Sequence, residues 1–201
     1  NNPFVNATTS EKYGSILLTF LIYFKLLVFP HPLTHDYYPK QIPLVETMEA
    51  LPMLSILINL LLIGYAIYGL KQKSIWSYLI IFYFGSFILY SNIVFPIGTF
   101  MNERFLYVSS LSIAIGLAVI ILKQLKTKRE FLAKLFLAAL LFGFSAKTIA
   151  RNYAWENDET LALTDVETST NSAKIQMSAG LSYLDLAKKE ENPQKKSQYL
   201  G

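Results

Sequence analysis

The residues whose types and spacing could do chemistry lie in two polar segments between apolar runs. Glu103 and Arg104 stand in the first segment, Phe100 to Tyr107. A guanidinium at a membrane surface matches a phosphate group through its fixed fork of donors. Ionisable side chains at such depth are costly and are candidates for function. The alternative is that Arg104 pairs with Glu103 or a lipid headgroup and only anchors its helix.

The second segment is the loop from Phe29 to Pro43, which contains both histidines of the chain, His31 and His35, together with Asp36 and Tyr37. Imidazole and carboxylate groups suit either a divalent cation or proton transfer. We therefore keep a divalent cation as a hypothesis, without assigning a metal site. The prolines indicate a stiff loop. The alternative is a rigid loop with hydrogen-bonded histidines and interfacial tyrosines.

Composition indicates that these segments belong to a membrane protein. Of 201 residues, 53% are hydrophobic and only 16% are charged, and the apolar residues form long runs. The chain contains no cysteine, which excludes disulfides, thiolate metal sites and cysteine nucleophiles. The formal net charge is +4. We interpret this basic excess as a topology signal and expect no nucleic-acid partner.

The apolar runs predict an all-α, polytopic membrane region over residues 1–150. Crossing the roughly 30 Å hydrocarbon core takes about 20 apolar residues. Five runs approach this length: Tyr13 to Pro30, Ala50 to Leu70, Ile75 to Ile93, Phe105 to Leu122, and Phe131 to Ala146. We expect about five spans. The first run contains Lys25 and could instead be a re-entrant or interfacial helix.

Basic residues in the short loops predict the orientation. Lysine and arginine gather at 71–73 and at 123–129, which places both loops in the cytoplasm. Alternation then puts residues 31–49, residues 94–104 and the tail after Lys147 in a periplasm or lumen. The sequence lacks an initiator Met and ends within a predicted helix. We therefore expect a fragment of a longer integral membrane protein of a bacterial inner membrane or the endoplasmic reticulum.

The composition becomes polar after Arg151, which predicts a separate tail. Residues 151–170 should form a connecting helix, Tyr153 to Asp165, and a linker. Residues 171–201 should contain a helix from Ala173 to Lys189, a break, and the start of another helix. A helix, a turn and a second helix form the unit of an α-solenoid.

Several motifs in this order resemble those of a known family. They are Asn2-Pro-Phe, the histidine loop, the segment Asn102-Glu-Arg-Phe-Leu-Tyr-Val-Ser-Ser110, and Trp155 followed by a helical repeat. This order resembles the transmembrane and tetratricopeptide-repeat O-mannosyltransferases and their bacterial relatives. That family is similar to the GT-C glycosyltransferases, which use a polyprenyl or dolichyl phosphate sugar on the extracytoplasmic face.

The resemblance implies roles for the polar segments. Arg104 and Glu103 would bind the lipid phosphate, and the histidine loop would form a neighbouring wall of the donor pocket. The catalytic residues are unknown, because the acidic residues of the family lie in an earlier loop that this fragment would not contain. The tail would be a first, truncated tetratricopeptide repeat that binds protein acceptors. Gly180 and Tyr183 occupy the eighth and eleventh places of its first helix.

Two functions are therefore weighed. The first is the C-terminal membrane part of a lipid-phosphate-sugar-dependent protein glycosyltransferase, a hexosyltransferase active in O-mannosylation. The second is a non-catalytic membrane scaffold that presents a repeat domain to partner proteins. An acidic pair after an upstream span would favour the enzyme. A transporter or channel is disfavoured because the runs carry few polar residues.

Overall fold

The computed structural model describes residues 4–39 and 41–200 as helices joined by turns and loops, without a strand in that part of the chain. Asn2, Pro3, Lys40 and Gly201 lie outside the described residues. The helices are α1 (Thr9–Val28), α2 (Ala50–Leu70), α3 (Ile75–Phe87), α4 (Tyr107–Leu125), α5 (Glu130–Ala154), α6 (Asp158–Thr168), α7 (Ala173–Lys189) and α8 (Pro193–Leu200), with 3₁₀ turns η1 (Ile88–Tyr90) and η2 (Glu103–Leu106). The all-α prediction is confirmed for these residues.

Three helical segments are long and apolar enough to cross a membrane: Ala50–Leu70, Glu103–Leu125 and Glu130–Ala154. The apolar segment Ile75–Tyr90 is shorter. Of the five predicted spans, three are therefore candidates by length and composition in the described residues, and spans at α1 and α3 remain predictions.

Helix α1 lies in the core of the membrane region. Tyr23 of α1 is only 1% exposed. The Tyr23 ring packs edge-on against the Phe87 ring, with the two ring centroids 4.9 Å apart. Gly14 allows α1 to pass close to the segment before α2, because a Cβ atom there would overlap the Val45 carbonyl oxygen. This burial explains why α1 can carry more polar groups than a lipid-facing helix.

Helix α5 extends beyond the predicted run because its charged residues have partners. It continues through Lys147, which contacts His31, and through Arg151, which pairs with Asp165. The predicted bounds of the connecting helix were wrong, since Tyr153 still belongs to α5. Helix α6 begins after Asn157, whose side chain accepts a hydrogen bond from the Thr160 amide and so caps the helix.

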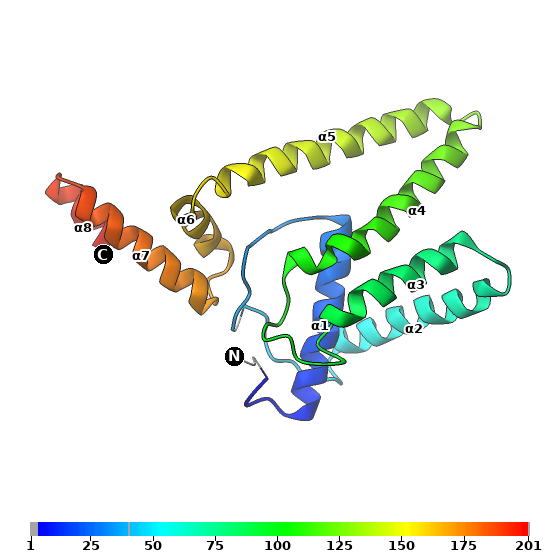
Figure 1. Cartoon of the computed structure of the whole chain (residues 1–201), viewed down its shortest axis with the longest axis horizontal. Coiled ribbons are helices and arrows are strands. Elements are labelled where there is room, and N and C mark those ends of the chain that lie inside the picture. Colours follow the sequence, from blue (N-terminus) through cyan, green and yellow to red (C-terminus); the bar gives the residue numbers. More distant parts are fainter. Residues whose placement is uncertain (1–3, 40, 201) are drawn as a thin grey trace.

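Figure 1 shows how these elements place the polar segments. Helices α1, α2 and α3 pack together, and α4 leads from them to the long helix α5. The tail of α6, α7 and α8 follows the far end of α5, and the loop after α1 extends toward α6 (Figure 1). Helix α7 has the bounds that the sequence predicted, and its N-cap is Ser172.

Candidate functional site

Asp165 of α6 is the centre of a buried polar cluster between the membrane region and the tail. Its side chain is fully buried. Two guanidinium nitrogens of Arg151 donate to its two oxygens at 2.6 and 2.9 Å. The backbone amide and the Nδ1 atom of His35 both approach Oδ2 at 2.7 Å. Asp165 thus joins the end of α5, the tail and the loop after α1.

The hydrogen bonds to Asp165 keep its carboxylate charged. Burial alone would raise the pKa of this group, because it removes water from the charged form. The hydrogen bonds from His35 and Arg151 outweigh burial and hold the pKa well below its usual range. A forked pair between arginine and a carboxylate is also among the strongest polar contacts in proteins.

Glu103 of η2 faces the same loop. Its Oε1 atom accepts hydrogen bonds from the Thr34 amide at 2.7 Å and from the Tyr37 hydroxyl at 2.9 Å. Burial and the nearby Glu103 carboxylate raise the pKa of Tyr37, so its hydroxyl stays protonated and donates. Glu103 therefore contacts the loop after α1 through Thr34 and Tyr37.

Two further side chains, those of Asp36 and Asn102, fix this arrangement. Asp36 accepts hydrogen bonds from the Tyr38 amide at 3.0 Å and from the Ser172 hydroxyl at 3.1 Å, which binds the loop to the start of α7. The side-chain amide of Asn102 donates to the His35 carbonyl oxygen at 3.0 Å. The loop is therefore held by both the η2 segment and the tail.

The two histidines point to different partners. The Nζ atom of Lys147 lies 3.1 Å from Nδ1 of His31, whereas His35 contacts Asp165. Within residues 4–39 and 41–200, no three or more histidine, aspartate or glutamate side chains are grouped so that they could hold a metal ion. The structure does not support the hypothesis that His31, His35 and Asp36 bind a divalent cation together.

Arg104 lies beside this cluster but does not join it. Its backbone amide donates to the Asn102 side chain at 3.2 Å. Its guanidinium carbon lies 5.8 Å from the centroid of the Phe105 ring, and the residue is exposed. No carboxylate among the described residues forms an ion pair with Arg104. Its charge is therefore available to a ligand.

The repeat residues lie on the outer side of the tail. Nothing lies within 4 Å of the position that a Cβ atom would take at Gly180. The Tyr183 side chain is exposed, and its ring stacks on Tyr199 of α8 with centroids 6.4 Å apart. Ile175 and Ala179 of α7 are buried.

Sequence reasoning missed the central residues of the cluster, Arg151 and Asp165. Asp165 stands three residues after Ala162, and both are buried on one side of α6. A charged residue on the apolar side of an amphipathic helix is a signal that could have drawn attention to it. Its partner His35 comes from a loop 130 residues earlier in the chain, and Arg151 lies 14 residues earlier on a different helix, so the sequence pattern alone could not identify them.

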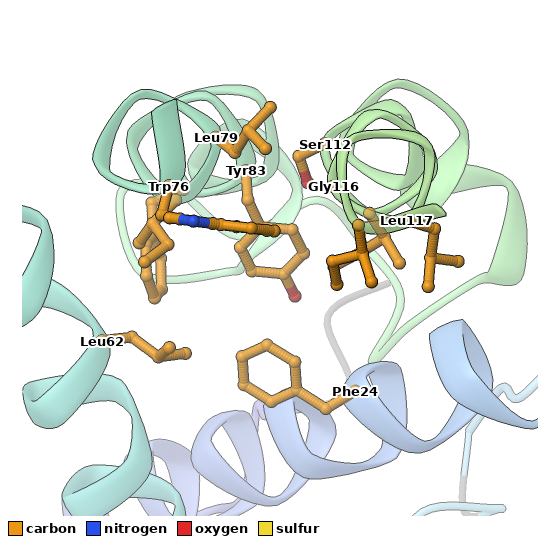
Figure 2. Close-up of a pocket in the computed structure, with 12 residues that line it drawn as sticks. Phe24, Leu62, Trp76, Leu79, Tyr83, Ser112, Gly116 and Leu117 are labelled. Carbon is orange, nitrogen blue, oxygen red and sulfur yellow. The ribbon is translucent and has the colours of Figure 1, made fainter. Parts of the chain in front are cut away.

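A separate apolar cavity of about 250 Å³ lies among the membrane helices. Figure 2 shows Trp76 and Tyr83 of α3 beside it, with Phe24 of α1, Leu62 of α2 and Gly116 of α4 around them. Gly116 allows this close packing, because a Cβ atom there would lie 3.2 Å from the Trp76 ring. The lining is almost wholly apolar, so this cavity is distinct from the polar cluster.

The chain is similar to protein O-mannosyl-transferases. It is 32% identical over 99 residues to Protein O-mannosyl-transferase TMTC3 of Homo sapiens, which covers 47% of this chain and 10% of that relative. It is 31% identical over 177 residues to Protein O-mannosyl-transferase TMTC1 of Mus musculus, which covers 80% of this chain and 19% of that relative. The chain thus spans no more than about a fifth of the length of these relatives.

Neither a family model nor a solved structure matches the chain. The likeness to the two transferases covers only part of their length. Together with the three helices that could cross a membrane, it identifies the chain as an integral membrane protein related in sequence to protein O-mannosyl-transferases.

Proposed function

We propose that the chain is the membrane part of a protein glycosyltransferase that uses a polyprenyl or dolichyl phosphate sugar on the extracytoplasmic face. Its similarity to protein O-mannosyl-transferases supports this reaction class. In this proposal Arg104 binds the donor phosphate, and the histidine loop forms a neighbouring wall. The catalytic residues are not assigned, and the tail binds the protein acceptor.

The observation that supports the role of Arg104 most strongly is the pairing of its neighbours. The Glu103 carboxylate already accepts hydrogen bonds from Thr34 and Tyr37. The Asp165 carboxylate already accepts hydrogen bonds from Arg151 and His35. Arg104 is left exposed without a carboxylate partner among the described residues. A guanidinium in that state can bind a phosphate through two parallel hydrogen bonds without first breaking an ion pair.

The test is sugar transfer by the full-length protein from a polyprenyl phosphate sugar to an acceptor peptide. Arg104→Ala should lower transfer about 100-fold or more, the usual cost of removing a group that stabilises charge in the reaction. Arg104→Lys should restore part of the activity. Arg129→Ala, the same change in the predicted cytoplasmic loop, is the matched control and should transfer normally. Full activity of the Arg104→Ala protein would contradict the proposal.

A scaffold is the second candidate because three carboxylates hold the loop after α1 to the tail and to the η2 segment. Asp36, Glu103 and Asp165 all accept hydrogen bonds within the cluster. A scaffold needs this rigid connection and no donor lipid. It predicts that the wild-type full-length protein performs no transfer and that the Arg104→Ala protein still binds its partner proteins.

A further inference from the structure

The end of α5 and the loop after α1 enclose a second charged site, centred on Lys147 and His31. The Nζ atom of Lys147 lies 3.1 Å from Nδ1 of His31. No carboxylate among the described residues forms an ion pair with Lys147. The near partner of this ammonium is an imidazole nitrogen and not a carboxylate, so a ligand could supply the opposite charge.

Two cavities meet at this pair of side chains. One has a volume of about 330 Å³ and is otherwise apolar, lined by residues that include Val28, Phe29, Gly143 and Phe144. The other has a volume of about 200 Å³ and includes Arg151, Thr164 and Thr168. His31 and Lys147 line both cavities. The charged pair therefore stands between an apolar groove and a more polar pocket.

The charge of these linings favours an anion. Of the described residues that line either cavity, none is acidic. Arg151 is already balanced by Asp165, which leaves Lys147 as the unbalanced charge. A phosphate placed at Lys147 would gain a charge-assisted hydrogen bond and would separate no ion pair.

The apolar groove also opens toward lipid. Only 6% of the apolar window of α5 is buried within the protein, so most of this helix would face the hydrocarbon core. A lysine near the end of a membrane helix extends its charged group to the lipid headgroups. A chain of a neighbouring lipid can thus enter the groove from the side while its phosphate stays at the membrane surface.

We infer that Lys147 and His31 bind the phosphate of an anionic membrane phospholipid, with one acyl chain in the apolar groove and the polar headgroup toward Thr164 and Thr168. The site is independent of the proposed sugar transfer, since it needs only that the helices lie in a membrane. It is centred on Lys147 and not on Arg104, and its ligand is a membrane phospholipid and not the sugar donor. Its occupant would fill the space between α1, α5 and α6.

The experiment measures lipid binding by native mass spectrometry on the purified full chain. Phosphatidylglycerol, phosphatidylcholine of the same acyl chains, and a polyprenyl phosphate are offered separately. We expect the wild type to prefer phosphatidylglycerol. Lys147→Gln should weaken that binding about tenfold, the effect of losing one charged hydrogen bond, and should reduce the preference for phosphatidylglycerol over phosphatidylcholine. Lys134→Gln is the control on the same helix, because Lys134 pairs with Glu130.

A second variant tests the groove itself. Gly143 lines the groove, and nothing lies within 4 Å of the Cβ position there, so Gly143→Leu should fill the groove without disturbing the fold. It should lower binding of both phospholipids, whereas Gly64→Leu at an equally open position on α2 should not. Wild-type binding by both Lys147→Gln and Gly143→Leu would overturn the proposal. So would binding of polyprenyl phosphate without binding of phosphatidylglycerol.

Discussion

At the scale of residues, the carboxylate of Asp165 controls how the tail meets the membrane region. It is fully buried, and it accepts hydrogen bonds from Arg151 and from His35, which come from different elements. A buried charge is costly unless it is paired, and removal of one partner leaves the other uncompensated. The position of the tail should therefore depend strongly on this one side chain.

We predict that Asp165→Asn loosens α6 from the loop after α1. The free energy of protection of α6 amides, measured by hydrogen exchange, should fall by about 3 kcal/mol, the usual cost of breaking a buried ion pair. Asp185→Asn is the matched control, since Asp185 is exposed and pairs with Lys188 of the same helix. The control should change protection of α6 little.

The pH dependence checks the same prediction. The pKa of Asp165 is lowered in the folded protein, from about 3.9 for a free aspartate. The contribution of Asp165 to the free energy of protection of α6 is therefore present above about pH 4. It is lost as the pH falls through the lowered pKa of the folded state. The difference between wild type and Asp165→Asn should stay constant from pH 8 to pH 5 and shrink in stronger acid. A difference that disappears between pH 8 and pH 5 would contradict this assignment.

At the scale of elements, periodicity predicted the helices better than the loops. The bounds of α2 and α7 agree with those predicted from the sequence. An apolar run or an apolar stripe of that length is typical of a helix. The length of α5 could not be predicted, since Lys147 and Arg151 looked like the end of a span. Their partners, His31 and Asp165, are brought to them only by the folded chain.

The candidate site could also be predicted only in part. The sequence identified Glu103, Arg104 and the histidine loop, because these are unusual residue types beside apolar runs. It could not show that Glu103 binds Tyr37 or that His35 binds Asp165. Those contacts join segments far apart in the chain, so they depend on how the helices pack.

Close packing of α1 gives a prediction at this scale. Alanine normally stabilises a helix relative to glycine by about 1 kcal/mol. At Gly14 the new methyl group would overlap the backbone of Val45, and crowding of this kind costs about 1–3 kcal/mol. Gly14→Ala should therefore lower the thermal stability of the detergent-solubilised protein. Gly64→Ala, at an open position, should not lower it; equal stability of the two variants would contradict the packing.

At the scale of the whole molecule, three distant segments converge on one end of the membrane region. The loop after α1, the η2 segment and the tail are joined by Glu103 and Asp165. The basic loops after α2 and α4 do not contribute to this cluster. Such separation is expected if the cluster lies outside the cytoplasm and the basic loops lie inside. The proposed binding of a lipid phosphate sugar requires this orientation.

The measurement that tests this orientation most directly is labelling of single cysteines in intact cells. The chain has no cysteine of its own, so each introduced thiol gives a clean signal. Met48→Cys and Lys188→Cys probe the loop after α1 and the tail, whereas Gln72→Cys and Lys128→Cys probe the basic loops. All four positions are exposed.

A maleimide that cannot cross the membrane should label positions 48 and 188 in intact cells or in sealed vesicles whose lumenal side faces outward. It should label positions 72 and 128 only after the membrane is made permeable. Labelling of positions 72 and 128 before permeabilisation, with positions 48 and 188 protected, would place the cluster in the cytoplasm and contradict the proposed function.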